Sequence, residues 1–204
     1  MKRMTDGKKA LLRREELDTP IGKIVLVTRG ERLCSLVFAD GRARTKAALA
    51  RRFQGARIEP ASGLRATTAL KEYFAGRFAA LSRIAVDPGG TEFQNRVWSA
   101  LREVRAGTTA SYGTVARAIG APGAGRAVGA ANGANPIAIV IPCHRLVGAN
   151  GSLTGYGFGL ERKRWLLDHE QAHAPSRVRA IARSGDGGKL RMLRGKRSTR
   201  YSTM

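Results

Sequence analysis

Short runs of apolar residues, separated by turn signals, predict strands at the start of the chain. The predicted strands cover residues 11–17, 23–28 and 33–38, with turns expected at residues 19–22 and 29–32. Segments 45–53 and 64–74 instead space their apolar residues at helical intervals, which indicates two short amphipathic helices. Together these patterns predict a small α/β unit with an antiparallel sheet.

A turn-rich break at residues 87–90 separates this unit from a second set of periodic segments. Directly after the break, Thr91 and Gln94 have the spacing of a capping box and predict the start of a helix. Two more short helices are expected over residues 111–120 and 125–132. Because a tight, glycine-containing turn joins them, they predict a helix-turn-helix.

The stretch from Ile139 to Val147 combines two apolar runs with a polar centre. An apolar run of this kind is typical of a buried strand, and Pro142 would then stand at the strand's end. We therefore expect a short strand that brings Cys143 to the floor of a pocket. The alternative, that Cys143 is only a small buried residue, stays open on these residues alone. A loop rich in glycine and aromatic residues follows at residues 153–159, and a last helix is expected over residues 160–170.

The helix expected over residues 125–132 is rich in small residues. Gly129 and Gly133 lie within or beside it, where a glycine costs about 1 kcal/mol relative to alanine. One explanation is close packing of this helix against a neighbour. The other is close approach to a DNA minor groove, with the cation of Arg126 at the helix start.

Charge is the most unusual property of the composition. The chain carries 37 Lys and Arg against 15 Asp and Glu, a net charge of +22, which predicts affinity for polyanions. The excess is +10 in residues 1–88, +4 in residues 89–170 and +8 in residues 171–204. The last segment lacks sustained periodicity, so we expect a basic, mostly disordered tail. We expect an N-terminal domain, a second domain and this tail at the same boundaries.

Cysteine use and hydropathy indicate an intracellular protein. Cys34 and Cys143 lie far apart and do not suggest a disulfide framework, and Cys34 sits among apolar residues of a predicted strand. No apolar run approaches the roughly 18 residues of a membrane helix. Residues 1–14 lack the apolar core of a signal peptide. We therefore expect a cytoplasmic protein with reduced thiols and no membrane association.

From Phe93 to Glu170 the sequence resembles the methylated-DNA–protein-cysteine methyltransferases, also called O6-alkylguanine-DNA alkyltransferases. The resemblance rests on blocks that occur in the family's order: residues 93–98, 111–113, 126–129, 135–136, 141–145, 151, 155–156 and 160–170. The Pro-Cys-His-Arg block at residues 142–145 is the most specific of them. Residues 1–88 resemble the family's smaller α/β domain only loosely, and residues 171–204 have no counterpart.

The expected fold class is α/β. It consists of a small N-terminal α/β domain with an antiparallel sheet and helices, followed by a mostly helical C-terminal domain. That second domain is expected to contain the helix-turn-helix and a short strand that carries the Pro-Cys-His-Arg motif.

The resemblance implies catalytic roles for five residues: Cys143, His144, Glu170, Tyr112 and Asn135. Cys143 would attack the alkyl carbon on guanine O6 as a thiolate. His144 would deprotonate the thiol through a water, with Glu170 orienting the imidazole. Tyr112 would give a proton to the leaving guanine, and Asn135 would support the turn around the site. Neighbouring side chains of a regular strand point to opposite faces, so Cys143 and His144 cooperate only if the backbone bends there.

The resemblance also implies an interface with double-stranded DNA that contains O6-alkylguanine. Arg126 is expected to enter the minor groove and fill the space of a flipped nucleotide. Four further residues are expected at the DNA: Ala127, Gly129, Ala130 and Tyr112.

The substrate pocket implied by the resemblance is lined by five residues: Val147, Gly148, Tyr156, Gly157 and Phe158. Phe158 stands where many family members have a small residue, and it is expected to disfavour bulky alkyl groups. Because the alkylated cysteine would be a thioether without a good leaving group, each molecule is expected to act once.

We expect a monomer without cofactor or metal. His169 and His173 have a metal-compatible spacing, but no third ligand lies near them in the sequence. Some family members hold a structural zinc in the N-terminal domain. Since this chain has no histidine before His144 and only Cys34 as a thiol there, we expect no such site.

Two other functions compete with alkyl transfer. Alkyltransferase-like proteins bind lesions without the cysteine, and Cys143 argues against that class. A helix-turn-helix regulator would place polar side chains on its recognition helix to contact base edges. The helix expected here offers mostly alanine and glycine, so little sequence specificity is expected.

Overall fold

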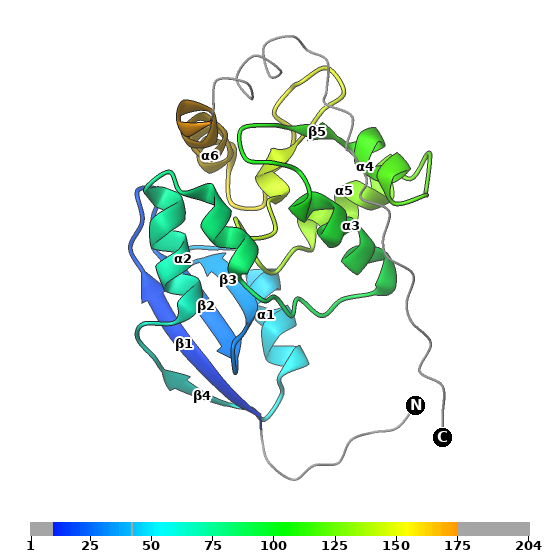
Figure 1. The fold of residues 1–204 in the computed structure, drawn as a ribbon. Helices are drawn as coiled ribbons and strands as arrows, with labels where there is room; N and C mark the ends of the chain where they lie inside the picture. Colours follow the sequence, from blue (N-terminus) through cyan, green and yellow to red (C-terminus); the bar gives the residue numbers. More distant parts are fainter. Residues whose placement is uncertain (1–9, 42, 175–204) are drawn as a thin grey trace, which may run out of the picture.

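The computed structural model describes residues 10–41 and 43–174, and its N-terminal part is built on a four-stranded sheet (Figure 1). The strands are β1 (Leu11–Leu17), β2 (Ile24–Arg29), β3 (Arg32–Phe38) and β4 (Arg57–Pro60), in the spatial order β3-β2-β1-β4. β2 pairs antiparallel with β1 and β3, while β4 runs parallel to β1. The three strands expected from the apolar pattern are confirmed. So is the turn between β2 and β3, where Gly30 has a φ of 55°.

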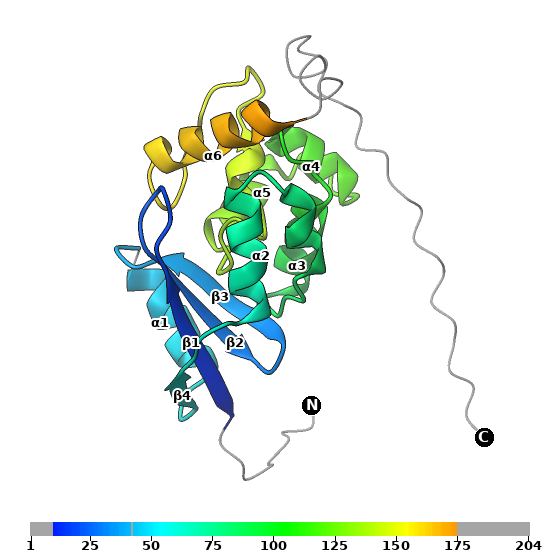
Figure 2. The ribbon, with the colours of Figure 1, turned by 60° about the vertical axis from the view of Figure 1, so that its left-hand side comes forward.

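Helices lie on both sides of this sheet (Figures 1 and 2). They are α1 (Ala43–Arg52), α2 (Arg65–Phe74) and the 3-10 segment η1 (Phe78–Arg83). α1 and α2 confirm the two predicted amphipathic helices. Strand β4 was not predicted, because its one large apolar side chain, Ile58, is 52% exposed and Pro60 interrupts the pattern. The buried face of the sheet packs against α2 through Leu70 and Tyr73.

Two later segments of the chain cover the outer edge of β3. Leu33 exchanges backbone hydrogen bonds of 2.9 and 2.8 Å with residues 85–87, and Leu36 exchanges two of 2.9 Å with residues 136–138. These bonds occupy groups that an edge strand otherwise leaves exposed. They also anchor the segment that leads to Cys143 onto the N-terminal sheet.

The second part of the chain is mostly helical. Its helices are α3 (Glu92–Arg102), α4 (Tyr112–Ala118), α5 (Gly125–Gly133) and α6 (Leu160–His173). Both hydrogen bonds of the predicted capping box are present, since Gln94 N donates to Thr91 Oγ1 at 3.3 Å and Thr91 N donates to Gln94 Oε1 at 2.9 Å. Helices α3, α4 and α5 pack against one another, and α6 lies above the sheet and contacts the Pro-Cys-His-Arg motif (Figure 1).

The segment before Cys143 is not a strand, so that part of the prediction is wrong. Residues 137–142 are all apolar and buried, but they form tight turns in which Ile139 has a φ of 67°. Such a conformation is unfavourable for a β-branched residue. The apolar run reflects burial, and burial without periodicity does not distinguish a strand from a turn.

The Pro-Cys-His-Arg motif itself continues as the 3-10 turn η2 (Cys143–Arg145). A short strand, β6 (Leu146–Val147), follows the motif instead of carrying it, and it pairs in parallel with β5 (Ala110–Ser111). The turn supplies the backbone bend that cooperation between Cys143 and His144 requires.

The expected architecture is confirmed: a small, mostly antiparallel sheet with helices comes first, and a mostly helical part follows. The helix-turn-helix stays a prediction. The predicted boundary at residues 87–90 stays a prediction, and one continuous cluster of buried side chains includes members from both parts. Helix α6 extends to His173, so the expectation that the tail begins at residue 171 is wrong for its first three residues; residues 175–204 of the expected tail lie outside the described residues.

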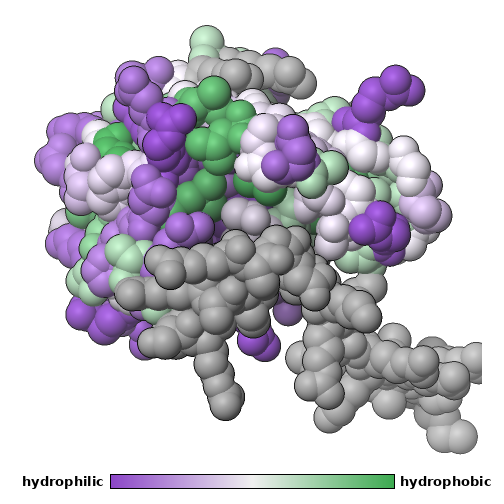
Figure 3. Space-filling model, turned by 90° about the horizontal axis from the view of Figure 1, so that it is seen from above, coloured by the Kyte–Doolittle hydropathy of each residue, from purple (hydrophilic) through white to green (hydrophobic). Residues whose placement is uncertain are grey.

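The surface is mixed in character. Seen from above, it shows a strip of hydrophobic surface between hydrophilic regions (Figure 3). Within residues 10–41 and 43–174, no helix has both the length and the apolar character needed to cross a membrane.

Candidate active site

Cys143 lies at the wall of a cavity of about 420 Å³ between the helical part and the glycine-rich loop. The lining residues come from α1, α4, α5 and the segment after it, η2, the glycine-rich loop and the start of α6: Thr45, Tyr112, Gly129, Asn132, Gly133, Asn135, Cys143, Gly155, Tyr156, Gly157, Phe158, Gly159 and Leu160. Seven of the residues predicted from the sequence are among them. The cavity therefore joins most of the expected pocket to the expected nucleophile.

Some predicted residues lie elsewhere. Val147 and Gly148 do not line this cavity; Val147 is buried and pairs with Ser111 in the short parallel sheet. Arg126, Ala127 and Ala130 are exposed on α5. They therefore lie outside the cavity and on the surface of the helix that forms one of its walls.

The Cys143 thiol is buried, with 4% of the residue exposed. Burial raises the pKa of this thiol above its usual value, while the Asn135 side chain and the backbone N–H groups of Cys143 and His144 act in the opposite direction. Asn135 also braces the turn, because its Nδ2 donates to Ile141 O at 2.9 Å and its Oδ1 accepts from Ile137 N at 2.9 Å. This is the supporting position expected for Asn135.

His144 is fully buried and contacts Glu170, with Nε2 at 2.9 Å from Glu170 Oε1. Its other ring nitrogen, Nδ1, is buried without a hydrogen-bond partner. Burial lowers the pKa of His144, although Glu170 opposes this effect, so the ring is neutral at neutral pH. A neutral ring that donates from Nε2 to a carboxylate carries its free lone pair on Nδ1, which is the property a general base needs.

Glu170 is the most heavily hydrogen-bonded side chain of the site. Its two oxygens accept from Tyr73 OH, His144 Nε2, Arg145 Nε and Nη2, and Gly107 N, at 2.8 to 3.2 Å. Burial alone would raise the pKa of this carboxyl. The adjacent His144 and Arg145 outweigh burial and hold the pKa far below its usual range, so Glu170 is ionised.

Lys163 was not predicted as part of the site. It is fully buried on α6, and its Nζ donates to Leu146 O at 2.5 Å and to Thr154 O at 2.6 Å. The ammonium therefore ties the strand after the motif to the glycine-rich loop. The available signal was its spacing, because Lys163, Leu166, Leu167 and Glu170 form one buried stripe of α6.

Aromatic residues shape the remaining wall of the cavity. The Phe158 ring packs against Phe38 at 5.2 Å and Tyr156 at 5.6 Å between centroids, so a strand of the N-terminal sheet supports the pocket. The Tyr112 hydroxyl lies 2.9 Å from Thr154 Oγ1. The buried Tyr156 hydroxyl has no hydrogen-bond partner, and burial raises its pKa well above the usual value.

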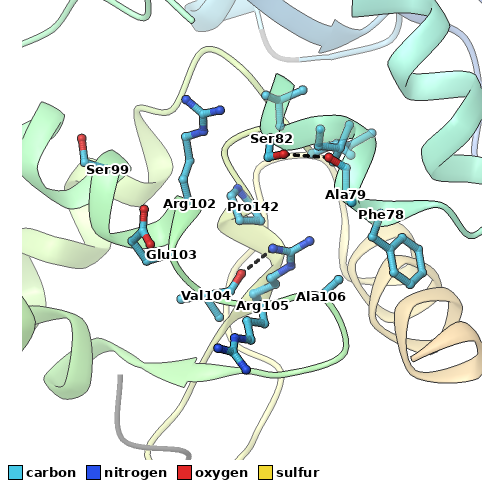
Figure 4. Close-up of a pocket in the computed structure, with 14 residues that line it drawn as sticks. Phe78, Ala79, Ser82, Ser99, Arg102, Glu103, Val104, Arg105, Ala106 and Pro142 are labelled. Atoms are coloured by element: carbon cyan, nitrogen blue, oxygen red, sulfur yellow. Dashed lines mark hydrogen bonds between the residues drawn. The ribbon is translucent and has the colours of Figure 1, made fainter. Parts of the chain in front are cut away.

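A larger cavity of about 690 Å³ is lined in part by Pro142 and Arg145 of the motif (Figure 4). η1, the end of α3 and the loop after it form most of its wall, and Pro142 and Arg145 complete it. Arg145 Nη1 donates to Val104 O at 2.5 Å at this wall. Since Cys143 does not line this cavity, we do not assign the substrate to it.

No group of three His, Cys, Asp or Glu side chains is placed to hold a metal ion among the residues that the structure describes. His169 and His173 instead belong to an aromatic cluster, in which the His169 ring stacks on Trp165 at 4.8 Å. His173 packs edge-on against Phe78.

Comparison with known proteins gives the family. Residues 92–172 match the family model described as 6-O-methylguanine DNA methyltransferase, DNA binding domain. A methylated-DNA–protein-cysteine methyltransferase of Mycolicibacterium paratuberculosis is 46% identical over 160 residues, which cover 78% of this chain and 93% of that protein. The chain belongs to the methylated-DNA–protein-cysteine methyltransferase family. This membership confirms the predicted enzyme class.

Other relatives of the family agree. A methylated-DNA–protein-cysteine methyltransferase of Salmonella typhimurium is 56% identical over 101 residues, or 50% of this chain and 59% of that protein. A crystal structure of Mycobacterium tuberculosis OGT in complex with DNA is 43% identical, with a TM-score of 0.68 over 80% of this chain and 96% of that chain. The O6-methylguanine-DNA methyltransferase of Pyrococcus kodakaraensis is 25% identical, with a TM-score of 0.61 over 78% and 98% of the two chains.

Proposed function

We propose that this protein repairs DNA by transferring the alkyl group of an O6-alkylguanine to its own Cys143. The thiolate attacks the alkyl carbon, and a C–S bond forms while the bond from that carbon to guanine O6 breaks. The thiol proton passes to His144, and the guanine takes up a proton from Tyr112, which regains one from solvent. The product is a thioether without a good leaving group, so each molecule acts once.

The observation that carries this proposal is the hydrogen bonding of the His144 ring. Its Nε2 is held by an ionised carboxylate, its Nδ1 is unpartnered, and its neighbour in the chain is the Cys143 thiol. A buried thiol with a raised pKa needs such a base, because only the thiolate is nucleophilic. Neither a lesion-binding module nor a sequence-reading regulator requires this arrangement.

The DNA side of the proposal rests on α5. Arg126 is exposed near its start, and a Cβ added at Gly133 would meet no atom within 4 Å. At Gly129 such a Cβ would lie 3.4 Å from the Tyr112 ring, an ordinary contact distance. Packing within the described chain therefore does not require these glycines, which favours close approach of an external partner. In this proposal α5 enters the minor groove of the duplex and Arg126 fills the space of the flipped base.

Mass spectrometry of the protein after incubation with duplex DNA containing O6-methylguanine tests the reaction. We expect a gain of one methyl group on the peptide that contains Cys143, and none with unmodified DNA of the same sequence. Excess substrate should give a plateau at one methyl group per molecule. Continued formation of repaired DNA beyond that plateau would contradict a single-use mechanism.

Base flipping has its own test in Arg126→Ala. The variant should lose activity on duplex DNA much more than on free O6-alkylguanine base, because a flipping aid matters only where a base must leave its stack. Arg65→Ala, which removes an exposed arginine of α2, is the matched control. Equal losses on both substrates would exclude the finger role of Arg126.

Pocket size is tested by Phe158→Gly. Removing the ring should increase the rate with O6-benzylguanine more than the rate with the methyl lesion, because only the larger group uses the space. An unchanged ratio of the two rates would exclude Phe158 as a limit on alkyl size.

A further inference from the structure

Tyr73 links the N-terminal part of the protein to the catalytic residues. It lies on α2, is fully buried, and its hydroxyl donates to Glu170 Oε1 at 2.9 Å. Its ring is held in place by the edges and faces of Phe74, Phe78 and His169, with centroids 5.3 to 5.6 Å away. The hydroxyl is therefore delivered to Glu170 by a rigid aromatic cluster.

The oxygen that Tyr73 contacts is the one that holds His144. Glu170 Oε1 accepts from Tyr73 OH at 2.9 Å, from His144 Nε2 at 2.9 Å and from Arg145 Nη2 at 2.8 Å. Glu170 Oε2 accepts from Gly107 N at 3.1 Å and Arg145 Nε at 2.9 Å. Of these donors, Tyr73 alone belongs to the N-terminal sheet and its helices.

We propose that Tyr73 is a positioning residue for alkyl transfer: its hydroxyl holds Glu170 Oε1 in place, and through it the orientation and basicity of His144. This inference rests on the proposed function, in which His144 is the base for Cys143. It assigns to the N-terminal part a direct role in setting up the reaction.

The electrostatic consequence of this hydrogen bond has a definite sign. Burial, and then the charge of Glu170, raise the pKa of Tyr73 well above its usual value, so Tyr73 stays a donor at any working pH. Its hydrogen bond disperses part of the negative charge on Glu170 Oε1. Without that bond the carboxylate stabilises an imidazolium more strongly, so His144 is protonated at higher pH.

Removing this hydroxyl deletes none of the other charged groups around His144. They are Glu170 and Lys163 on α6 and Arg145 on η2, with Cys143 as the neighbouring titratable thiol. A change in the titration of His144 would therefore report on the Tyr73 hydroxyl.

Tyr73→Phe removes the hydroxyl and keeps the ring. The chain has three histidines, so ¹⁵N labelling of histidine leaves only three imidazole rings to follow against pH. We expect the midpoint of His144 to rise by about half a unit to one unit. The acidic limb of the methyl-transfer rate should move to higher pH by the same amount. His169, whose ring contact with residue 73 is kept, is the internal control.

Phe78→Leu is the matched packing control. It loosens the cluster around Tyr73 without removing a hydrogen bond to Glu170, so it should leave the midpoint of His144 in place. An unchanged His144 titration and pH profile in Tyr73→Phe would overturn the role of Tyr73, whatever the loss of rate. A shift of equal size in Phe78→Leu would overturn it as well. Wild-type protein that takes up no methyl group would instead overturn the proposed function, and the histidine titration would still measure the coupling.

Discussion

The two thiols of this protein occupy similar surroundings and are expected to behave differently. Cys34 and Cys143 are both buried, and burial raises the pKa of both. Cys143 lines a cavity of about 420 Å³, and Cys34 lines another of about 360 Å³. Asp87 lies beside the Cys34 thiol, and Glu170 contacts His144, the neighbour of Cys143 in the chain. Burial and access to a cavity therefore do not separate a reactive thiol from an inert one.

The two thiols differ in the position of the carboxylate. Asp87 Oδ2 lies 3.9 Å from Cys34 Sγ, where its charge opposes formation of a thiolate and raises the thiol pKa further. Glu170 contacts His144 instead, and in the proposed mechanism its charge supports the base that removes the proton from Cys143. A carboxylate next to the thiol disfavours the thiolate, whereas a carboxylate next to an intervening imidazole favours proton transfer from the thiol.

Replacing each cysteine by alanine should give the largest difference between the two thiols. Cys143→Ala should abolish methyl transfer and leave binding to lesion DNA, because recognition depends on α5 and the pocket. Cys34→Ala should transfer at the wild-type rate, with a packing cost of about 1 kcal/mol. Mass spectrometry and a gel-shift assay measure the two properties, and transfer by Cys143→Ala would exclude Cys143 as the sole acceptor.

Neutralising the two carboxylates should have unequal effects on the reaction. Glu170→Gln removes the charge that orients His144 and should slow transfer by roughly 10²-fold or more, the range typical of general-base catalysis. Asp87→Asn should leave the rate unchanged. Single-turnover kinetics at saturating DNA gives both values, and equal rates for the two variants would contradict the assignment of Glu170.

The same pair of variants should differ in stability. Glu170 is fully buried with Arg145, so Glu170→Gln should lower the free energy of unfolding by about 3–5 kcal/mol. Asp87 has a side chain 19% exposed and pairs with Arg29, which is 51% exposed, and with Arg52, which is 27% exposed. Asp87→Asn breaks two partly exposed ion pairs and should cost about 1 kcal/mol. Urea unfolding measures both, and a cost below 1 kcal/mol for Glu170→Gln would show that its network adds little stability.

Acid should weaken the network around Cys143 through Glu170. The folded pKa of Glu170 lies far below its unfolded value of about 4.3, so its contribution to stability is complete above that value. The contribution is lost progressively as the pH falls below about 4.3. Unfolding midpoints measured from pH 6 to pH 3 should decline less steeply in Glu170→Gln than in wild type. Parallel declines would place the acid sensitivity elsewhere.

The smallest expected effect concerns Cys34 itself. Asp87→Asn removes a charge that raises the pKa of this thiol, so Cys34 should react somewhat faster with a small disulfide reagent. It should still accept no methyl group from DNA, because no base stands beside it. Peptide mapping after each treatment distinguishes the two outcomes. Methylation of Cys34 in this variant would mean that a thiolate alone suffices.

Much of the fold was predictable because its signals are local. The strands up to Phe38 and the capped start of α3 follow from apolar spacing and from Thr91 with Gln94. The turn before Cys143 was not predictable, since the left-handed Ile139 depends on how residues 136–138 attach to β3. That attachment joins segments about 100 residues apart and leaves no local pattern.

Residues of the site that belong to a recognisable sequence motif could be predicted. Cys143, Asn135 and Tyr156 meet at the cavity as expected, whereas Lys163 and Tyr73 were missed. A lysine in a helix is usually exposed, and a tyrosine among apolar residues is usually core. Their roles arise from partners in other segments, which the spacing of residues does not reveal.

The covered edge of β3 has a consequence for the synthesis of the chain. Leu36 emerges from the ribosome about 100 residues before Ile137, its partner in the bridge at that edge. At a synthesis rate of 5–20 residues per second, this part of the β3 edge stays unpaired for roughly 5 to 20 s. During that time β3 presents unpaired backbone groups to any other extended chain. The nascent chain is therefore most prone to aggregate before the segment that leads to Cys143 has been synthesised. Slower translation would lengthen this interval and is expected to reduce the soluble yield.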